Sequence, residues 1–436
     1  MSWQKAVIAT ALVDPSSVVE AMDLLPSDFD RPNNFLWAEI LGIVNNYASM
    51  SFNFGPTLFR WLEKEHPHTA EKIIEADHDS CRRLNHGNAI TQVYNHIIMP
   101  LSSRRDQLTQ IRWAKSYFRS RFGRETEGIW LGETAINMET ILCLIEEGIR
   151  FTILSPNQAD AFRSLDSSNW TRTDQQPIDT RRPYRVFAKD KNGKELGGFI
   201  DVFFFDEPLS RAISFGDILT SSERFAGELH TRLNNPTGPG DAVIVATDGE
   251  TFGHHKPLTD MCLSFLFTKA GPDKGLTPVN FGYLLEHHPP RFEVILRNAH
   301  GEGTAWSCAH GVGRWIRNCG CHTGGSDGWN QNWRTALRNA FEAAQKRIDH
   351  TFEQSLSEFV DDPWKVRDAY ESIMDSPTLA ETQTALEHLG TKRALTRLDV
   401  EQIRRLLEAQ KFALFSFTSC GWFFSDISGI ETLQNM

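Results

Sequence analysis

The chain has 436 residues, with 45 lysines and arginines against 56 aspartates and glutamates, and a net charge of −11. Hydrophobic residues make up 40% and charged residues 23%, a globular composition that excludes wholesale disorder. The acidic balance argues against general nucleic-acid binding, which needs a basic surface. The sequence also lacks the run of about 18 apolar residues that a transmembrane helix requires, so we expect neither nucleic acid nor membrane as a partner.

The cellular location is predicted from the N-terminus and the cysteines. The apolar segment 6–13 is short and is not followed by a small-residue cleavage site, so we do not interpret it as a signal peptide. Seven cysteines are too few for a disulfide scaffold in a chain of this length. These features favour the cytoplasm and leave the oligomeric state open.

The N-terminal part of the sequence has mostly helical periodicity. Apolar residues recur every three or four positions, which predicts helices over 35–44, 58–62, 69–77 and 102–122. Thr57 is expected to cap the second of these helices.

A βαβ unit is predicted next. The apolar run 128–131 indicates a buried strand, 137–147 has one apolar helical face, and 149–154 is again strand-like. A strand, a helix and a strand at this spacing predict two parallel strands joined by a crossover helix.

The following residues continue the alternation. Residues 156–185 are expected to be mostly loop, and strands are expected at 197–205, 241–247 and 292–297, with helices near 216–233 and 258–269 between them. This alternation is typical of an α/β barrel.

The C-terminal part of the chain is different in character. Helical patterns begin at Trp333 and continue over 366–374 and 400–407, and the chain ends on an aromatic segment. We therefore predict three parts: a catalytic barrel over 1–298, a glycine- and cysteine-rich loop over 299–330, and a helical domain over 331–436.

Two carboxylates follow predicted strands. Asp248 opens an Asp-Gly-Glu-Thr-Phe-Gly-His-His motif directly after the strand at 241–247, and Glu133 closes a Trp-Leu-Gly-Glu motif. In a barrel of parallel strands, such positions open into the active site. Cleavage of a glycosidic bond needs a pair of carboxyl groups. The structural alternatives are that Asp248 caps the next helix and that Glu133 lies in the first turn of one.

On these motifs, the chain resembles family 57 of the glycoside hydrolases. It is most similar to the α-amylase/α-mannosidase-like branch, whose members have an extra C-terminal domain of unknown function. The resemblance implies an incomplete (β/α)7-type barrel and a retaining hydrolase or transglycosylase that acts on α-linked oligo- or polysaccharides without a cofactor or metal. It also implies that Glu133 is the nucleophile and that Asp248 is the acid/base.

The resemblance implies substrate contacts as well. His96 precedes an apolar-Pro-Leu run of the family, and Trp422 and Asp426 lie in a late aromatic motif. The complete set of residues expected to contact substrate is His96, Trp130, Glu250, His254, His255, Trp306, Trp422 and Asp426.

Two departures from the family pattern stand out. Gly132 replaces the proline that is usual before the nucleophile, and the opening His-x-His-x-x-Gln-Pro motif is not found. A catalytically impaired, truncated homologue that binds glycans is therefore one alternative. Another is a metal-dependent enzyme of the α-mannosidase or deacetylase type, with Asp248, His254 and His255 as ligands.

Cysteines and histidines gather in the loop at 308–322. Their side chains suit zinc, but the sequence lacks the paired Cys-x-x-Cys of a common zinc ribbon. We expect instead a glycine-permitted loop over the active site that holds no metal. In that interpretation Trp306, Trp315 or Trp329 would stack on sugars.

Overall fold

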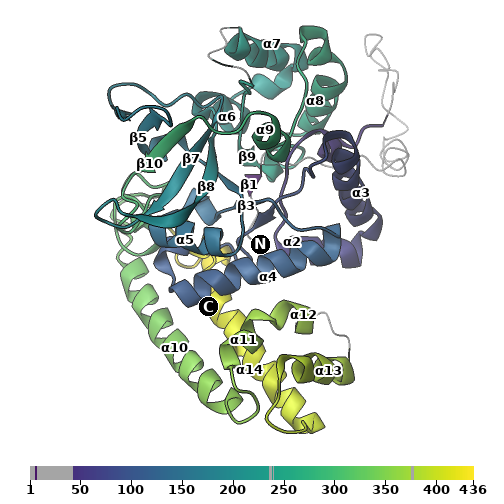
Figure 1. Cartoon of the computed structure of the whole chain (residues 1–436), viewed down its shortest axis with the longest axis vertical. Helices are drawn as coiled ribbons and strands as arrows, with labels where there is room; N and C mark the ends of the chain where they lie inside the picture. The colour runs from purple at the N-terminus through teal and green to yellow at the C-terminus, as the bar shows by residue number, and fades with distance from the viewer. Residues whose placement is uncertain (1–4, 7–42, 235–237, 239, 375–377) are drawn as a thin grey trace.

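The computed structural model describes residues 5–6, 43–234, 238, 240–374 and 378–436. Figure 1 shows an α/β body at the top and a helical C-terminal region at the bottom, with α4 (Arg104–Phe122) running between them. Residues 35–42 of the helix predicted over 35–44, and residues 7–13 of the segment 6–13, lie outside the described residues, and residues 43–44 are not helical. The predicted α/β class with a helical C-terminal region is confirmed.

The body contains an eight-stranded mixed sheet. In spatial order the strands are β2 (Thr91–Gln92), β3 (Gly128–Trp130), β4 (Phe151–Leu154), β8 (Glu195–Phe204), β7 (Pro183–Lys189), β10 (Phe292–Leu296), β5 (Ala159–Ser164) and β6 (Thr171–Arg172). Strands β2, β3, β4 and β8 run parallel, and β7 and β8 form an antiparallel hairpin. Strand β10 pairs parallel with β7 and antiparallel with β5.

The predicted βαβ unit is present. Helix α5 (Met138–Glu146) connects β3 to β4, which pair in parallel. The side chain of Asn137 caps α5 by accepting a hydrogen bond of 2.9 Å from the backbone N–H of Thr140. The segment 156–185, expected to be loop, instead contains β5, β6 and the start of β7, because β5 pairs with a strand about 130 residues further along the chain.

The apolar segment 241–247 does not join the main sheet. Only its end forms a strand, β9 (Thr247–Asp248), which pairs antiparallel with β1 (Lys5–Ala6). The preceding residues Ile244 and Ala246 pack instead into a cluster around Trp130. Burial of these apolar side chains thus occurs without sheet pairing.

Two helices begin differently from the prediction. The prediction that Thr57 caps the helix is wrong, because α2 (Pro56–Glu65) has Gly55 at its N-cap and Pro56 in its first turn, where the fixed φ of proline suits a helix start.

The helix expected near 216–233 is α7 (Ser222–Leu233), preceded by α6 (Glu207–Phe215). The helix expected over 258–269 is α8 (Thr259–Phe265), which continues as one π-type turn.

Among the described helices, none is long and apolar enough to cross a membrane. The helices not yet given are α3 (Pro67–Leu84), α9 (Phe281–His287), α10 (Trp333–Leu356), α11 (Pro363–Asp368), α12 (Tyr370–Met374), α13 (Leu379–Leu389), α14 (Arg397–Phe415), α15 (Cys420–Phe423) and α16 (Ile430–Asn435).

The helical C-terminal region contacts α4 through a buried ion pair. The guanidinium of Arg367 is fully buried and lies 2.8 Å from a carboxylate oxygen of Asp106. It also donates to Thr109 and Gln410, and the backbone carbonyl of Arg367 accepts from the indole of Trp113. A buried charge with this many partners fixes how α11 sits on α4.

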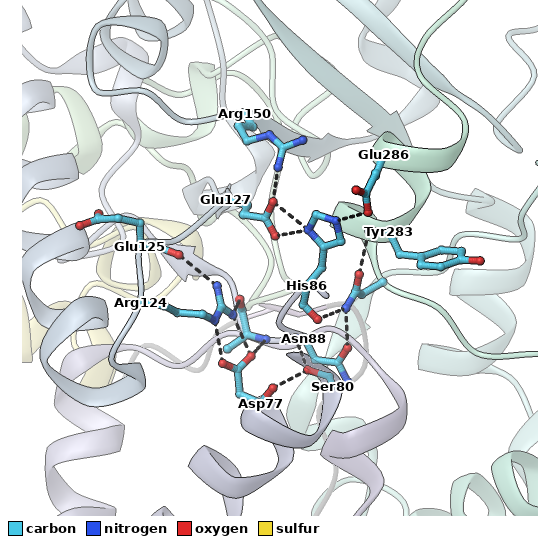
Figure 2. A network of polar contacts seen from close by, with 12 residues as sticks. Asp77, Ser80, His86, Asn88, Arg124, Glu125, Glu127, Arg150, Tyr283 and Glu286 are labelled. Carbon is cyan, nitrogen blue, oxygen red and sulfur yellow. Dashed lines mark hydrogen bonds and ion pairs between the residues drawn. The ribbon is translucent and has the colours of Figure 1, made fainter. Parts of the chain in front are cut away.

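A polar network holds the edge of the sheet where β2 and β3 begin (Figure 2). Asp77, fully buried on α3, accepts two hydrogen bonds of 2.8 Å from Arg124 and one of 2.7 Å from the backbone of Ala89. The imidazole of His86 lies between Glu127, at 2.8 Å, and Glu286, at 3.0 Å. The network therefore ties α3, the start of β3 and α9 together.

We predict that Asp77→Ala lowers the free energy of unfolding by about 3 kcal/mol, because it leaves Arg124 without its buried partner. Chemical denaturation followed by circular dichroism measures this change. Asp79→Ala, on the same helix but with its ion pair at the surface, is the matched control and should leave stability nearly unchanged. Equal stability of the two variants would contradict the structural role of Asp77.

Candidate active site

Glu133 lies in a strained turn directly after β3. Its backbone has φ 56° and ψ 25°, and the next residue, Thr134, has φ 53°. Non-glycine residues rarely adopt this left-handed conformation, and each such residue costs about 1–3 kcal/mol unless its surroundings hold it there. Two in succession at a carboxylate are a structural reason to look for function at this turn.

Gly132 allows the turn to pack tightly against the loop after β2. A Cβ on Gly132 would lie 2.6 Å from the carbonyl oxygen of Ile97 and 3.1 Å from that of His96. This close approach gives a physical reason for glycine at the position where the family pattern has proline. The turn containing Glu133 thus packs on the backbone of His96 and Ile97.

His96 is buried beneath this turn and also has a left-handed φ, of 54°. Its Nδ1 lies 2.6 Å from the hydroxyl of Ser419, and its carbonyl oxygen accepts a hydrogen bond of 3.0 Å from the backbone of Ser419. His96 therefore connects the Glu133 turn to the C-terminal region.

The carboxylate of Glu133 has two donors on one oxygen. Its Oε2 accepts a hydrogen bond of 3.0 Å from the indole Nε1 of Trp306 and one of 2.5 Å from the hydroxyl of Ser307. The residue is 4% exposed. An ionised carboxylate is an acceptor only, so this arrangement suits a charged side chain.

A second set of hydrogen bonds fixes the backbone of the turn. The hydroxyl of Thr134 donates to the side-chain oxygen of Gln158 at 2.8 Å and accepts from the backbone N–H of Trp306 at 3.1 Å. The amide nitrogen of Gln158 donates to the carbonyl oxygen of Thr134 at 2.8 Å. Neither Ser307 nor Gln158 was selected from the sequence, although the capping box that begins at Ser155 after β4 gave a signal for Gln158.

Aromatic rings connect the Glu133 turn to the segment that leads to Asp248. Trp306 packs edge-on against Trp130, with ring centroids 5.5 Å apart, and against Phe205 at 5.6 Å. These three rings belong to one apolar cluster with Ile244 and Ala246. The chain segments that end in the two candidate carboxylates are therefore packed on the same cluster.

The structure does not support the alternatives in which Asp248 caps the next helix and Glu133 lies in the first turn of α5. Asp248 precedes a short 3₁₀ turn over Gly249–Thr251, but its side chain makes no capping hydrogen bond to that turn. Glu133 lies before the N-cap of α5, and the acidic residue in the first turn of that helix is Glu139.

Side-chain hydroxyls position the Asp248 motif. The hydroxyl of Thr247 lies 2.6 Å from that of Ser214 on α6 and 3.0 Å from that of Thr251. Asp248 and Glu250 are half-buried. His254 and His255 are exposed, with their rings 4.9 Å apart.

Three other residues were expected to contact substrate: Trp130, Trp422 and Asp426. Trp130 is 0% exposed and Trp422 is 1% exposed. The ring of Trp422 stacks on Phe417 and Trp333 with centroids 6.3 and 6.2 Å apart. Neither indole offers a free face to a sugar. Asp426 accepts from the backbone and hydroxyl of Ser428 and so closes a turn.

Potential metal ligands gather in the segment 308–321 and not within the Asp248 motif. The ligand atoms of Cys308, His310, Cys319 and Cys321 all lie within 4.8 Å of one another. Within the part of the chain that the structure describes, no comparable group includes Asp248, His254 or His255. The geometry therefore gives no support to these three residues as a metal centre.

The fold is of the α/β class with a helical C-terminal region, and comparison with known proteins identifies the family. The model of glycosyl hydrolase family 57 matches residues 27–267, more than half of the chain, and the chain belongs to this family. A second model, a domain of unknown function (DUF3536), matches residues 329–436.

Individual proteins resemble this chain in sequence or in fold. Alpha-amylase 1 of Dictyoglomus thermophilum is 26% identical over 208 residues, which cover 47% of this chain and 26% of the relative. An exo-type maltose-forming amylase from Pyrococcus sp. ST04 shares the fold with a TM-score of 0.65 at 15% identity, covering 89% of this chain and 66% of that one. A 4-alpha-glucanotransferase from Thermococcus litoralis has a TM-score of 0.51 at 15% identity, covering 89% and 52%. The chain thus spans about a quarter of the curated relative.

We predict that Gly132→Ala destabilises the protein by about 1–3 kcal/mol, because the added methyl group would press on the carbonyl oxygen of Ile97. Thermal unfolding measures the change. Gly227→Ala on α7 is the matched control, since a Cβ there meets nothing within 4 Å, and it should stabilise by about 0.5–1 kcal/mol. A Gly132→Ala variant as stable as the wild type would contradict the tight packing of the turn.

Proposed function

We propose that this chain is a retaining glycoside hydrolase or glucanotransferase that acts on α-glucans. The observation that carries the proposal is the buried Glu133 carboxylate, held in a left-handed turn by two hydrogen-bond donors on one oxygen. Membership of glycosyl hydrolase family 57 supports this class of reaction. The amylase and glucanotransferase named above support α-glucans as the substrate.

In the proposed mechanism, a carboxylate oxygen of Glu133 attacks the anomeric carbon while the bond to the leaving oxygen breaks. Asp248 donates its proton to that oxygen, and a glycosyl ester remains on Glu133. Asp248 then takes a proton from water, or from a hydroxyl of an acceptor sugar, whose oxygen displaces Glu133. Water gives hydrolysis and a sugar gives transfer, and both products retain the anomeric configuration.

Other residues have supporting roles in this proposal. Trp306 and Ser307 are positioning residues that orient the Glu133 carboxylate. Glu250, His254 and His255 lie beside Asp248 in the sequence and are at least partly accessible, so they are the proposed sugar contacts. The backbone of His96 packs against Gly132 in the Glu133 turn, and its imidazole bonds to Ser419.

We predict that Glu133→Gln lowers cleavage of maltoheptaose and amylose at least about a thousandfold, because an amide cannot form the glycosyl ester. Product analysis by chromatography measures the loss, and the sizes of the wild-type products separate hydrolysis from transfer. Glu139→Gln, a surface carboxylate on α5, is the matched control and should keep full activity. Glycan binding without turnover in the wild type, unchanged in Glu133→Gln, would overturn the proposal in favour of a glycan-binding homologue.

We predict that Asp248→Asn accumulates the covalent intermediate on α-maltosyl fluoride, whose leaving group needs no acid. The first step then proceeds, but the second lacks its general base. Intact-mass spectrometry should detect a maltosyl adduct that peptide mapping places on Glu133, and azide should release it as the α-azide. An adduct on another residue would contradict the assignment of the nucleophile.

We predict that Trp306→Phe lowers kcat/KM by roughly 10- to 100-fold, because a hydrogen bond to a charged group contributes about 1.5–3 kcal/mol. The phenyl ring keeps part of the packing on Trp130, so the loss should lie mainly in kcat. Trp61→Phe, a half-exposed indole on α2, serves as the control. A change in KM alone would indicate that Trp306 acts as a sugar platform and not as a positioning residue.

A further inference from the structure

The loop that supplies Trp306 and Ser307 also brings three thiols and one imidazole together. The Sγ of Cys308 lies 3.9 Å from that of Cys319 and 3.8 Å from that of Cys321. The Nδ1 of His310 lies 3.4 Å from the Sγ of Cys321. Cys308 is buried, and Cys319 and Cys321 are half-buried. The family comparison assigns no role to these four residues.

We propose that Cys308, His310, Cys319 and Cys321 form a structural zinc site. A tetrahedral zinc ion with Zn–S bonds of about 2.3 Å and a Zn–N bond of about 2.0–2.1 Å separates its sulfur ligands by about 3.8 Å and sulfur from nitrogen by about 3.5 Å. The observed S–S separations of 3.8 and 3.9 Å and the S–N separation of 3.4 Å match the edges of that tetrahedron. Four protein ligands complete the coordination, which is characteristic of a structural and not a catalytic zinc.

The linear spacing of these residues lacks a Cys-x-x-Cys pair, but the fold brings the four side chains together. Cys308 and His310 are separated from Cys319 and Cys321 by a loop containing a short 3₁₀ turn over Gly313–Trp315. One Cys-x-His pair and one Cys-x-Cys pair come together across this loop, with all four ligand atoms within 4.8 Å of one another. The four residues therefore converge without a Cys-x-x-Cys pair.

Charge around the site gives a second, independent argument. Arg334 is 0% exposed and Arg314 is buried beside it. Within the described residues, neither guanidinium forms an ion pair with a carboxylate. Both donate hydrogen bonds to backbone carbonyl oxygens, including that of Cys321. A buried cation normally requires a nearby anion. Zinc bound by three thiolates and one neutral imidazole carries a net charge of −1, which would supply it.

The site would act as a clamp between the active-site loop and the C-terminal region. Cys308 directly follows Ser307, which donates to Glu133. Arg334 on α10 bridges the carbonyl oxygens of Cys321 and Phe423, and the hydroxyl of Ser425 accepts from the backbone of Thr323. Binding of Zn²⁺ releases the three thiol protons to solvent, so no oxidant or further reactant is needed.

Metal analysis of the purified chain tests the proposal without any glucan assay. Protein prepared under reducing conditions and dialysed against metal-free buffer should contain about one zinc per chain by inductively coupled plasma mass spectrometry. Cys321→Ser should lose most of this zinc and unfold at a temperature lower by at least about 5 °C. Cys81→Ser, a half-buried cysteine on α3, is the matched control and should keep the metal.

Cobalt replacement tests the ligand set. Folded protein from which zinc has been removed should bind Co²⁺ with the intense thiolate-to-metal charge-transfer and visible bands of a tetrahedral site, and Zn²⁺ should displace it. His310→Ala should weaken Co²⁺ binding and keep the charge-transfer bands. Folded wild-type chain that takes up neither Zn²⁺ nor Co²⁺, that holds iron instead, or that shows only the weak bands of an octahedral site would overturn the proposal. These outcomes do not depend on whether the chain cleaves α-glucans.

Discussion

The geometry of the site depends on one set of non-local hydrogen bonds, those that join the Glu133 turn to residues 306–307. Two successive left-handed residues are unfavourable alone, and the backbone and side-chain bonds from Trp306 and Ser307 hold them in place. The partners of Glu133 lie more than 170 residues away in the sequence. The conformation of the carboxylate therefore depends on the whole fold. A change in the loop that contains Trp306 and Ser307 would alter the orientation of the Glu133 carboxylate.

Because the Glu133 turn depends on distant residues, contacts between the C-terminal region and the α/β body also affect the geometry of the site. The region makes two contacts near the site. The hydroxyl of Ser419 bonds to the imidazole of His96, and the guanidinium of Arg334 donates to the carbonyl oxygen of Cys321. The Arg367 ion pair with Asp106 also fixes α11 on α4. The region is therefore bonded both to the histidine that packs on the Glu133 turn and to the loop that supplies Trp306 and Ser307.

The sequence predicted what depends on neighbouring residues and missed what depends on distant ones. The βαβ unit follows from apolar periodicity and from the Asn137 cap, both of which are local. Ser307 could not be found, because one serine in a loop carries no signal until its partner is known. The strand expected over 241–247 failed for a related reason: its apolar residues pack on Trp130 and have no strand beside them in the sheet. The convergence of Cys308, His310, Cys319 and Cys321 was also missed, because their spacing in the sequence is not that of a common zinc motif.

Tryptophan shows most clearly where composition stops being informative. An indole that stacks on a sugar and an indole that fills a core look alike in a sequence, because both need a large apolar ring. Trp130 and Trp422 prove to be core residues, whereas Trp306 is partly accessible and has its N–H directed at a carboxylate. The same residue type thus serves packing at one position and orientation of a charge at another. What separates the roles is whether a polar partner lies at the edge of the ring, and only the three-dimensional arrangement places that partner.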